Sequence, residues 1–234
     1  LVILAYDLFR GSADDLGQRV DFTTLPAAEM WLFGGILPTV WIQDNFLMVL
    51  LSWLGIVMEA FYFGHFILPV VTLYWMWRHN AQDFRWAMGS LVLLSMAGFV
   101  TFALFPAAPP WMASYHGVIP KIHKLVSFHI ESLLPGNHWL ELYVQMNPNQ
   151  VAPFPSLHAG YPLLLWLWSR RCFPRAQWFF LINCWVVCLT IVAFGEHYVV
   201  DLLAGWLYAW VSLIMMDQLV NRLGAQETQL TADN

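Results

Sequence analysis

Residues 178–219 read WFFLINCWVVCLTIVAFGEHYVVDLLAGWLYAWVSLIMMDQL, which is two apolar runs separated by a short polar turn. A helix rises about 1.5 Å per residue, so about 20 apolar residues cross a bilayer. The turn holds Gly195, Glu196 and His197, and Asp201 lies near the start of the second run. This stretch predicts a helical hairpin in a membrane with ionisable groups at one end.

The composition of the whole chain agrees with a membrane protein. Of the 234 residues, 59% are hydrophobic and 11% are charged, whereas a soluble domain is about 25% charged. The net charge of −5, with only ten Lys and Arg, excludes the usual basic surface of a nucleic-acid-binding protein. The expected partners are therefore membrane lipids and not nucleic acid.

Other apolar runs predict three more spans, at residues 46–77, 86–105 and 157–169. The run at 46–77 exceeds one straight crossing, so we expect it to tilt or to bend near Pro69. Leu1–Ala5 is apolar but too short to span, so we expect the numbered chain to begin near the end of a first helix. The expected fold is an all-α integral membrane protein, a six-transmembrane-helix bundle with its first helix truncated at residue 1.

Two long connections, residues 11–45 and 107–155, fall on one side if the spans alternate. Residues 25–42 contain two prolines and two glycines, which favours a re-entrant or interfacial segment. Apolar residues recur at helical spacing in 122–134, which predicts an amphipathic helix on the bilayer surface or packed on the protein. These segments are expected on the same side as the polar turn.

Most of the arginines lie in the short loops and at the helix ends of the opposite side. The positive-inside rule therefore places the long connections on the extracytoplasmic or lumenal face, which is the plasma membrane's outer face in a bacterium. We expect residues 1–222 to form one membrane-embedded domain, followed by a polar C-terminal tail at 223–234.

The first candidate cluster is Pro155-Ser156-Leu157-His158. Proline and serine favour a helix start with Ser156 as N-cap, which puts His158 in the first turn. The free amides of such a turn can hold an anion such as phosphate. An ordinary capped helix without chemistry is the alternative interpretation.

The second cluster is in the turn of the hairpin. Gly195 ends one span and His197 is expected to open the next, so that His197 and Asp201 share a helix face as i and i+4. A carboxylate on one ring nitrogen leaves the other free as a nucleophile or base. A buried pair that only ties helix ends together is the alternative. Two histidines and a carboxylate on one side of the bilayer suit in-line displacement at phosphorus.

With these two clusters, the sequence resembles the type 2 phosphatidic acid phosphatase superfamily, in the branch that includes inositol phosphorylceramide synthase. The resemblance covers residues 62 to 205. Pro155, Ser156 and His158 match its Pro-Ser-x-His motif, and Gly195, His197, Tyr198 and Asp201 match its Gly-x-His-Tyr-x-x-Asp motif. The stretch FPAAPPW at 105–111 resembles another motif of the branch. Tyr62, His65, Phe66 and Pro69 match a Tyr-x-x-His-Phe-x-x-Pro element.

The resemblance implies a bundle of six helices and chemistry without a metal or other cofactor. It implies that His197 is the nucleophile that forms a phosphohistidine and that Asp201 orients it. His158 would protonate the leaving alcohol and then activate the acceptor. The other substrate- or phosphate-binding candidates are Ser156, Tyr198, Trp111, Lys121 and His65.

The chain also departs from the superfamily's pattern. Trp111 stands where an arginine would follow the prolines, and Thr190-Ile191 stands in place of a Ser-Arg pair. Without these guanidinium groups a doubly charged phosphomonoester is less well compensated, which favours transfer from a lipid diester, of phosphoinositol type. Lys121, Lys124 and two histidines of the outer loop are candidates for replacing the charge, or are solvated surface residues.

The sequence therefore favours one function and leaves one alternative open. The first is a membrane lipid phosphotransferase or phosphatase, with hydrolysis and transfer both open. The alternative is a non-catalytic subunit that keeps the fold inside a larger membrane complex and associates with other membrane subunits.

Overall fold

The computed structural model describes residues 20–126, 128, 151 and 153–232, and for 224–232 only the backbone. The predicted first helix and most of the predicted amphipathic helix at 122–134 lie outside these residues. Of the described part of the latter, residues 122–126 are not helical and Phe128 is. The described chain is all-helical apart from one isolated bridge between Asp21 and Ala107.

Within the described residues, four helices are long and apolar enough to cross a membrane. They are α4 (Trp53–His79), α5 (Ala81–Leu104), α10 (Gln177–Ala193, preceded by the short 3₁₀ helix η1, Pro174–Ala176) and α11 (Val199–Ala232). The remaining predicted span corresponds to α9 (Leu157–Cys172), which has only 16 residues. The predicted membrane-spanning, all-α class is confirmed, whereas the count of six spanning helices is not.

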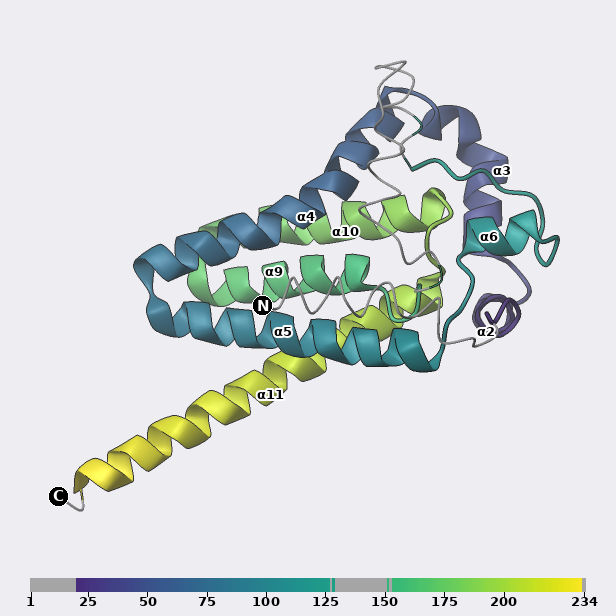
Figure 1. The fold of residues 1–234 in the computed structure, drawn as a ribbon. Coiled ribbons are helices and arrows are strands. Elements are labelled where there is room, and N and C mark those ends of the chain that lie inside the picture. The colour runs from purple at the N-terminus through teal and green to yellow at the C-terminus, as the bar shows by residue number, and fades with distance from the viewer. Residues whose placement is uncertain (1–19, 127, 129–150, 152, 233–234) are drawn as a thin grey trace.

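The long helices pack around α9, which contacts α4, α5, α10 and α11. Figure 1 shows the α4–α5 and α9–α10 connections at one end of this bundle and the starts of α9 and α11 at the other. The helix α4 passes through Pro69 without interruption and changes direction along its length (Figure 1). The two ends of the bundle therefore differ, since one has short loops and the other carries additional helices.

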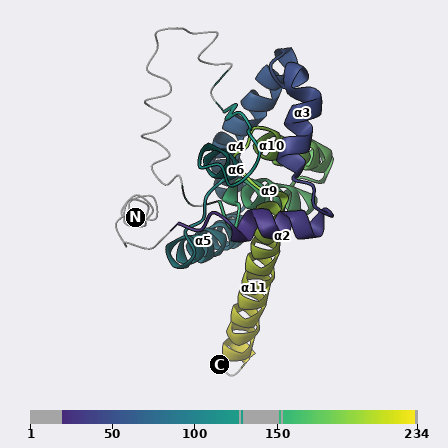
Figure 2. The same ribbon diagram turned by 90° about the vertical axis from the view of Figure 1, so that its right-hand side faces the viewer.

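Three short helices cover the end where α9 and α11 begin: α2 (Thr24–Leu32), α3 (Pro38–Leu50) and α6 (Pro110–Tyr115). Gly34 and Gly35 separate α2 from α3 with φ angles of 62° and 92°, which glycine adopts without strain. Neither α2, with 9 residues, nor α3, with 13, is long enough to cross a bilayer. Figure 2 shows α2 lying across the bundle near α11.

The start of α9 is as predicted, because the Ser156 hydroxyl accepts a hydrogen bond from the Ala159 amide at 3.2 Å. The start of α11 is not, because the helix begins at Val199 and His197 lies before it. The Asp201 carboxylate accepts the Tyr198 amide at 2.8 Å. This is the arrangement of a capping box, in which an acidic third residue satisfies the amide of the N-cap.

The other end of α11 extends further than expected. The helix continues to Ala232, so residues 223–232 of the polar tail are helical. The division into a domain at 1–222 and a tail at 223–234 stays a prediction.

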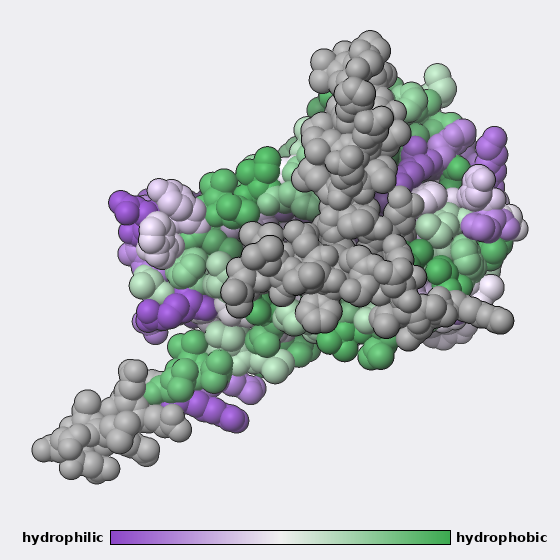
Figure 3. Space-filling model, viewed as in Figure 1, coloured by the Kyte–Doolittle hydropathy of each residue, from purple (hydrophilic) through white to green (hydrophobic). Residues whose placement is uncertain are grey.

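The distribution of polar residues fits a membrane. Figure 3 shows hydrophobic residues over the middle of the visible face and hydrophilic residues toward the two ends of the bundle. Large apolar side chains such as Ile67, Leu189 and Trp210 are exposed on the spanning helices. Lipid tails solvate such a surface, so it needs no protein partner.

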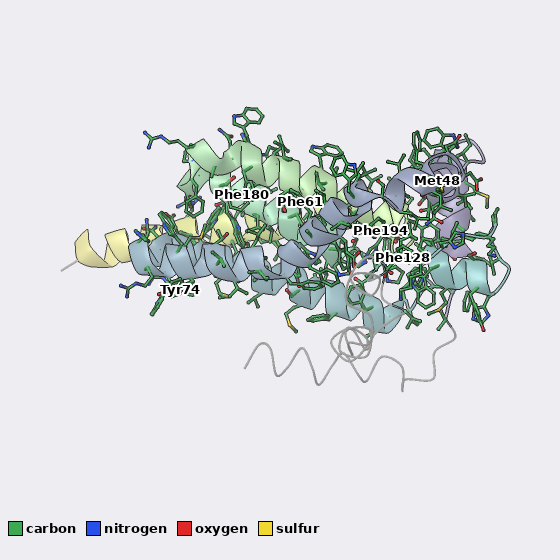
Figure 4. The ribbon with its side chains drawn as sticks, turned by 90° about the horizontal axis from the view of Figure 1, so that it is seen from above. Met48, Phe61, Tyr74, Phe128, Phe180 and Phe194 are labelled. Carbon is green, nitrogen blue, oxygen red and sulfur yellow. The ribbon has the colours of Figure 1, made fainter. Side chains whose placement is uncertain are left out.

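Two buried clusters fill the bundle. One includes Tyr62, Ile191 and Phe194, and the other includes Trp168 and Phe180. Figure 4 shows Phe180 and Phe194 well apart along the bundle, with Phe61 between them in this view. The first cluster surrounds the starts of α9 and α11 and supports the polar residues there.

The backbones at the starts of α9 and α11 approach each other closely. A Cβ atom on Gly205 would lie 2.1 Å from the Ser156 carbonyl oxygen, and one on Gly160 would lie 3.2 Å from the Gly205 carbonyl oxygen. The Ser156 amide also donates to the Asp201 carbonyl at 2.9 Å. Glycine at these positions therefore brings the first turns of the two helices into direct backbone contact.

We predict that Gly205→Ala lowers the free energy of unfolding by about 3 kcal/mol, because the new methyl group must push backbone apart. Thermal unfolding in detergent measures this loss. Gly64→Ala is the matched control, since a Cβ there meets nothing within 4 Å. Equal stability of the two variants would contradict the assigned packing.

Candidate active site

The two histidines of the predicted clusters meet at the starts of α9 and α11. Nδ1 of His158 lies 2.8 Å from Nε2 of His197, and the ring centroids are 5.1 Å apart. Behind His197, its Nδ1 lies 3.4 Å from Oδ2 of Asp201. The structure thus brings the three predicted catalytic residues into one chain of contacts.

The surroundings of His197 keep its ring neutral. Its side chain is almost fully buried, and burial lowers its pKa to about 3 despite the opposing contact with the Pro153 carbonyl. A neutral imidazole carries one N–H and one lone pair. With Nδ1 facing the Asp201 carboxylate, we assign the proton to Nδ1 and the lone pair to Nε2, the nitrogen that faces His158.

A group of aromatic side chains from α4 surrounds His158. The ring centroids of Tyr62, His65 and Phe66 lie 5.5, 4.8 and 5.8 Å from that of His158. His65 Nδ1 contacts the Tyr62 carbonyl, so Nδ1 is its donor, and its buried Nε2 has no hydrogen-bond partner in the described chain. The predicted residue His65 is therefore part of the site, beside His158.

Ser156 and Tyr198 are near the histidines but serve other contacts. The Ser156 hydroxyl caps α9, and its side chain is fully buried. Tyr198 packs in a buried cluster with Leu25 and Ile119, and burial raises the pKa of its hydroxyl. That hydroxyl has no hydrogen-bond partner among the residues that the structure describes.

Trp111 and a lysine lie beside the turn that precedes His197. The Trp111 amide donates to the Gly195 carbonyl at 3.0 Å. The Lys124 ammonium lies 4.1 Å from the Trp111 ring centroid and 3.8 Å from Oε1 of Glu196. Burial raises the pKa of Glu196, and Lys124 opposes this shift.

The predicted residue Lys121 is placed differently. Its side chain is exposed, and it forms no hydrogen bond or ion pair with the rest of the described chain. Lys124 is therefore the lysine of this loop that contacts the turn before His197.

A buried glutamine that the sequence motifs do not include holds this loop. Nε2 of Gln43, on α3, donates to the carbonyls of His123 and Ala193 at 2.8 Å each. Its Oε1 accepts the His123 amide at 2.7 Å. Gln43 thereby joins α3, the segment that carries Lys124 and the end of α10 just before the turn of His197.

A second residue outside the motifs is Glu29, on the buried face of α2. Its side chain is fully buried, and the acidic groups nearest to it include Asp201. For Glu29 the available signal was a single polar side chain in the apolar run LPAAEMWLF. Gln43 gave less, because it stands beside two other polar residues in TVWIQDNF. This signal indicates a special position but not what the side chain contacts.

No group of three or more His, Cys, Asp or Glu side chains in the described residues has the arrangement of a metal site.

Comparisons with known proteins identify the family of the chain. A family model described as the PAP2 superfamily matches residues 25–215. The inositol phosphorylceramide synthase catalytic subunit of Saccharomyces cerevisiae is 27% identical over 207 residues, which is 85% of this chain and 50% of that protein. The inositol phosphorylceramide synthase of Candida albicans is 28% identical over 192 residues, 77% of this chain and 39% of that protein.

A third relative, the inositol phosphorylceramide synthase catalytic subunit of Schizosaccharomyces pombe, is 25% identical over 131 residues, 54% of this chain and 31% of that protein. The chain thus spans half or less of the length of these relatives. No solved structure matches it significantly.

We predict that Gln43→Ala lowers the free energy of unfolding by roughly 2–4 kcal/mol, because it leaves buried backbone groups of His123 and Ala193 unpaired. Asn45→Ala is the matched control, since Asn45 is exposed and bonds only within its own helix, to the Trp41 carbonyl. Thermal unfolding of both variants measures the difference. A Gln43→Ala protein as stable as the control would show that the hydrogen bonds of Gln43 do not hold the loop.

Proposed function

The chain belongs to the PAP2 superfamily, and on that premise we propose that it is a membrane lipid phosphotransferase that reacts through His197, His158 and Asp201. The observation that carries the proposal is the 2.8 Å contact between His158 and His197 at two helix starts, with Asp201 behind His197. A nucleophile, an acid–base group and an orienting carboxylate are the groups that a two-step displacement at phosphorus requires.

In the first step, Nε2 of His197 attacks the phosphorus of a lipid phosphodiester, and the bond from phosphorus to the leaving alcohol oxygen breaks. His158, as imidazolium, gives its proton to that oxygen. The negative charge of the diester favours this protonated form of His158. The headgroup phosphate is then bonded to His197 as a phosphohistidine.

In the second step, His158 accepts the proton of an acceptor hydroxyl, whose oxygen attacks the phosphorus. The phosphorus–nitrogen bond breaks and returns His197 to its neutral form. A phosphoryl group does not fit between nitrogen atoms 2.8 Å apart, so the two rings must separate when the substrate binds.

The charge around the site supports a diester as substrate. In the described chain, the cation that contacts the turn before His197 is Lys124, and Glu196 neutralises part of its charge. One partly neutralised ammonium suits the single charge of a phosphodiester better than the double charge of a monoester. Ser156, Tyr198, Trp111, Lys121 and His65 remain our candidates for substrate contacts.

The printed names of the relatives support the choice of headgroup. They are inositol phosphorylceramide synthases, so we propose transfer of a phosphoinositol-type headgroup to a lipid hydroxyl. Water as the acceptor would make the protein a phosphatase. No observation favours the non-catalytic subunit, for which three buried polar groups at one place would be a cost without use.

We also propose how the protein lies in the membrane. The arginines at the end of the bundle opposite the site, such as Arg171 and Arg175, support a cytoplasmic position for that end. The site then faces the extracytoplasmic or lumenal side. We propose that α9 also spans the membrane, beside α4, α5, α10 and α11.

We predict that His197→Ala lowers the turnover number at least 10³-fold, because the nucleophile is lost. Wild-type protein mixed with a labelled phosphoinositol lipid should give an acid-labile phosphohistidine at His197, detected by mass spectrometry of its peptides. His79→Ala is the control, since His79 is exposed on α4 at the opposite end. Full turnover by His197→Ala with every candidate lipid would refute the mechanism.

A second prediction concerns the cation. Lys124→Gln should raise KM for the lipid donor about 10-fold, because it removes the positive charge beside the turn of His197. Arg175→Gln is the control, since it removes an exposed cation at the opposite end of the bundle, and it should change KM less than twofold. Equal effects of the two substitutions would show that Lys124 does not contact the phosphate.

A further inference from the structure

Glu29 is the one polar residue on the buried face of α2, where it is accompanied by Leu25 and Pro26. The outer face of the helix is apolar and includes the exposed residues Met30 and Trp31. Because the helix packs on α11, the carboxyl group of Glu29 is held against the other helix and away from solvent. A carboxyl group in such a place needs a physical reason, since burial of a charge without a partner costs several kcal/mol.

The surroundings of Glu29 are at the start of α11. Its carboxyl oxygens lie near the backbone amides of Val199 and Val200 without a short hydrogen bond to either. The titratable groups that face it are Asp201 and Tyr198. Tyr198 Oη and Oδ1 of Asp201 are also buried without hydrogen-bond partners in the described chain, so these groups form one small polar cluster between α2 and α11.

The contacts decide which of the two carboxyl groups carries the negative charge. Asp201 accepts the Tyr198 amide at 2.8 Å, which stabilises its ionised form, and it faces the neutral ring of His197 at 3.4 Å. Glu29 has no contact of comparable strength, and two carboxylates buried side by side repel each other. The proton of the pair therefore belongs on Glu29.

We propose that Glu29 is a positioning residue of the site, a neutral carboxyl group that packs on the first turn of α11 so that Asp201 alone bears the charge that orients His197. Its role in turnover rests on the proposed function, whereas its neutral state does not. Burial and the charge of Asp201 raise the pKa of Glu29 to about 8, which the amides of Val200 and Val199 oppose.

The neutral state has a consequence for stability. A carboxyl group whose pKa in the folded protein is raised from 4.5 to about 8 stabilises the fold fully below pH 4.5, and this contribution is lost as the pH rises toward 8. Glu29→Gln keeps the shape of the neutral group and removes the titration. The melting temperature of Glu29→Gln relative to wild type should therefore rise between pH 5 and pH 8, by roughly 5 °C or more.

Asp44→Asn is the matched control, because it removes the same charge from an exposed position on α3. Its melting temperature relative to wild type should stay constant over the same range. Parallel curves for Glu29→Gln and wild type, or a Glu29→Gln protein that does not fold, would overturn the proposal, since an amide should replace a neutral carboxyl group without penalty.

The pH dependence of turnover tests the role in positioning. Above pH 8, ionised Glu29 would place a second negative charge beside Asp201, which repels an anionic lipid. The kcat/KM of the wild type should therefore fall about 5-fold from pH 8 to pH 9, and that of Glu29→Gln should not. Identical profiles would show that Glu29 does not act on the site. If the wild type turns over no candidate lipid, the proposed function fails, whereas the melting curves still decide whether Glu29 is neutral.

Discussion

The close crossing of α9 and α11 is the contact on which the site depends. Without a side chain on Gly205, the backbone of α11 lies against the Ser156 carbonyl, and the Ser156 amide reaches the Asp201 carbonyl at 2.9 Å. This contact puts two helix starts side by side, each with a histidine. The 2.8 Å approach of those histidines then follows from the backbone and not from their own attraction.

Asp201 links the fold to the proposed chemistry. The same carboxylate accepts the Tyr198 amide at the start of α11 and faces His197. One side chain therefore both stabilises the helix start and orients the proposed nucleophile. The surrounding short segments support it from outside. Gln43 holds the segment of Lys124 against the end of α10, and Glu29 closes the start of α11 from α2.

Much of this architecture could be predicted from patterns that are local in the chain. Apolar runs located the spanning helices, and the proline and serine before His158 located the start of α9. Gly195 marked the end of the span that precedes α11, and the structure gives it a φ of 80°. The start of α11 was misplaced by two residues, because the Asp201 carboxylate satisfies the Tyr198 amide and the helix begins after it. The roles of Gln43 and Glu29 could not be predicted, because their partners lie far away in the sequence. The partners of Gln43, His123 and Ala193, are 80 and 150 residues away.

The sequence by itself determined the membrane class and the order of the helices, and it supplied His158, His197 and Asp201 as candidates, because helix length, capping and spacing are properties of neighbouring residues. Only the tertiary structure decided that His65 stands beside His158, that Lys124 and not Lys121 contacts the turn of His197, and that a second carboxyl group lies near Asp201. The physical reason is that these contacts join segments far apart in the chain, so no local pattern encodes them, and the crossing of α9 and α11 that brings the site together depends on Gly205.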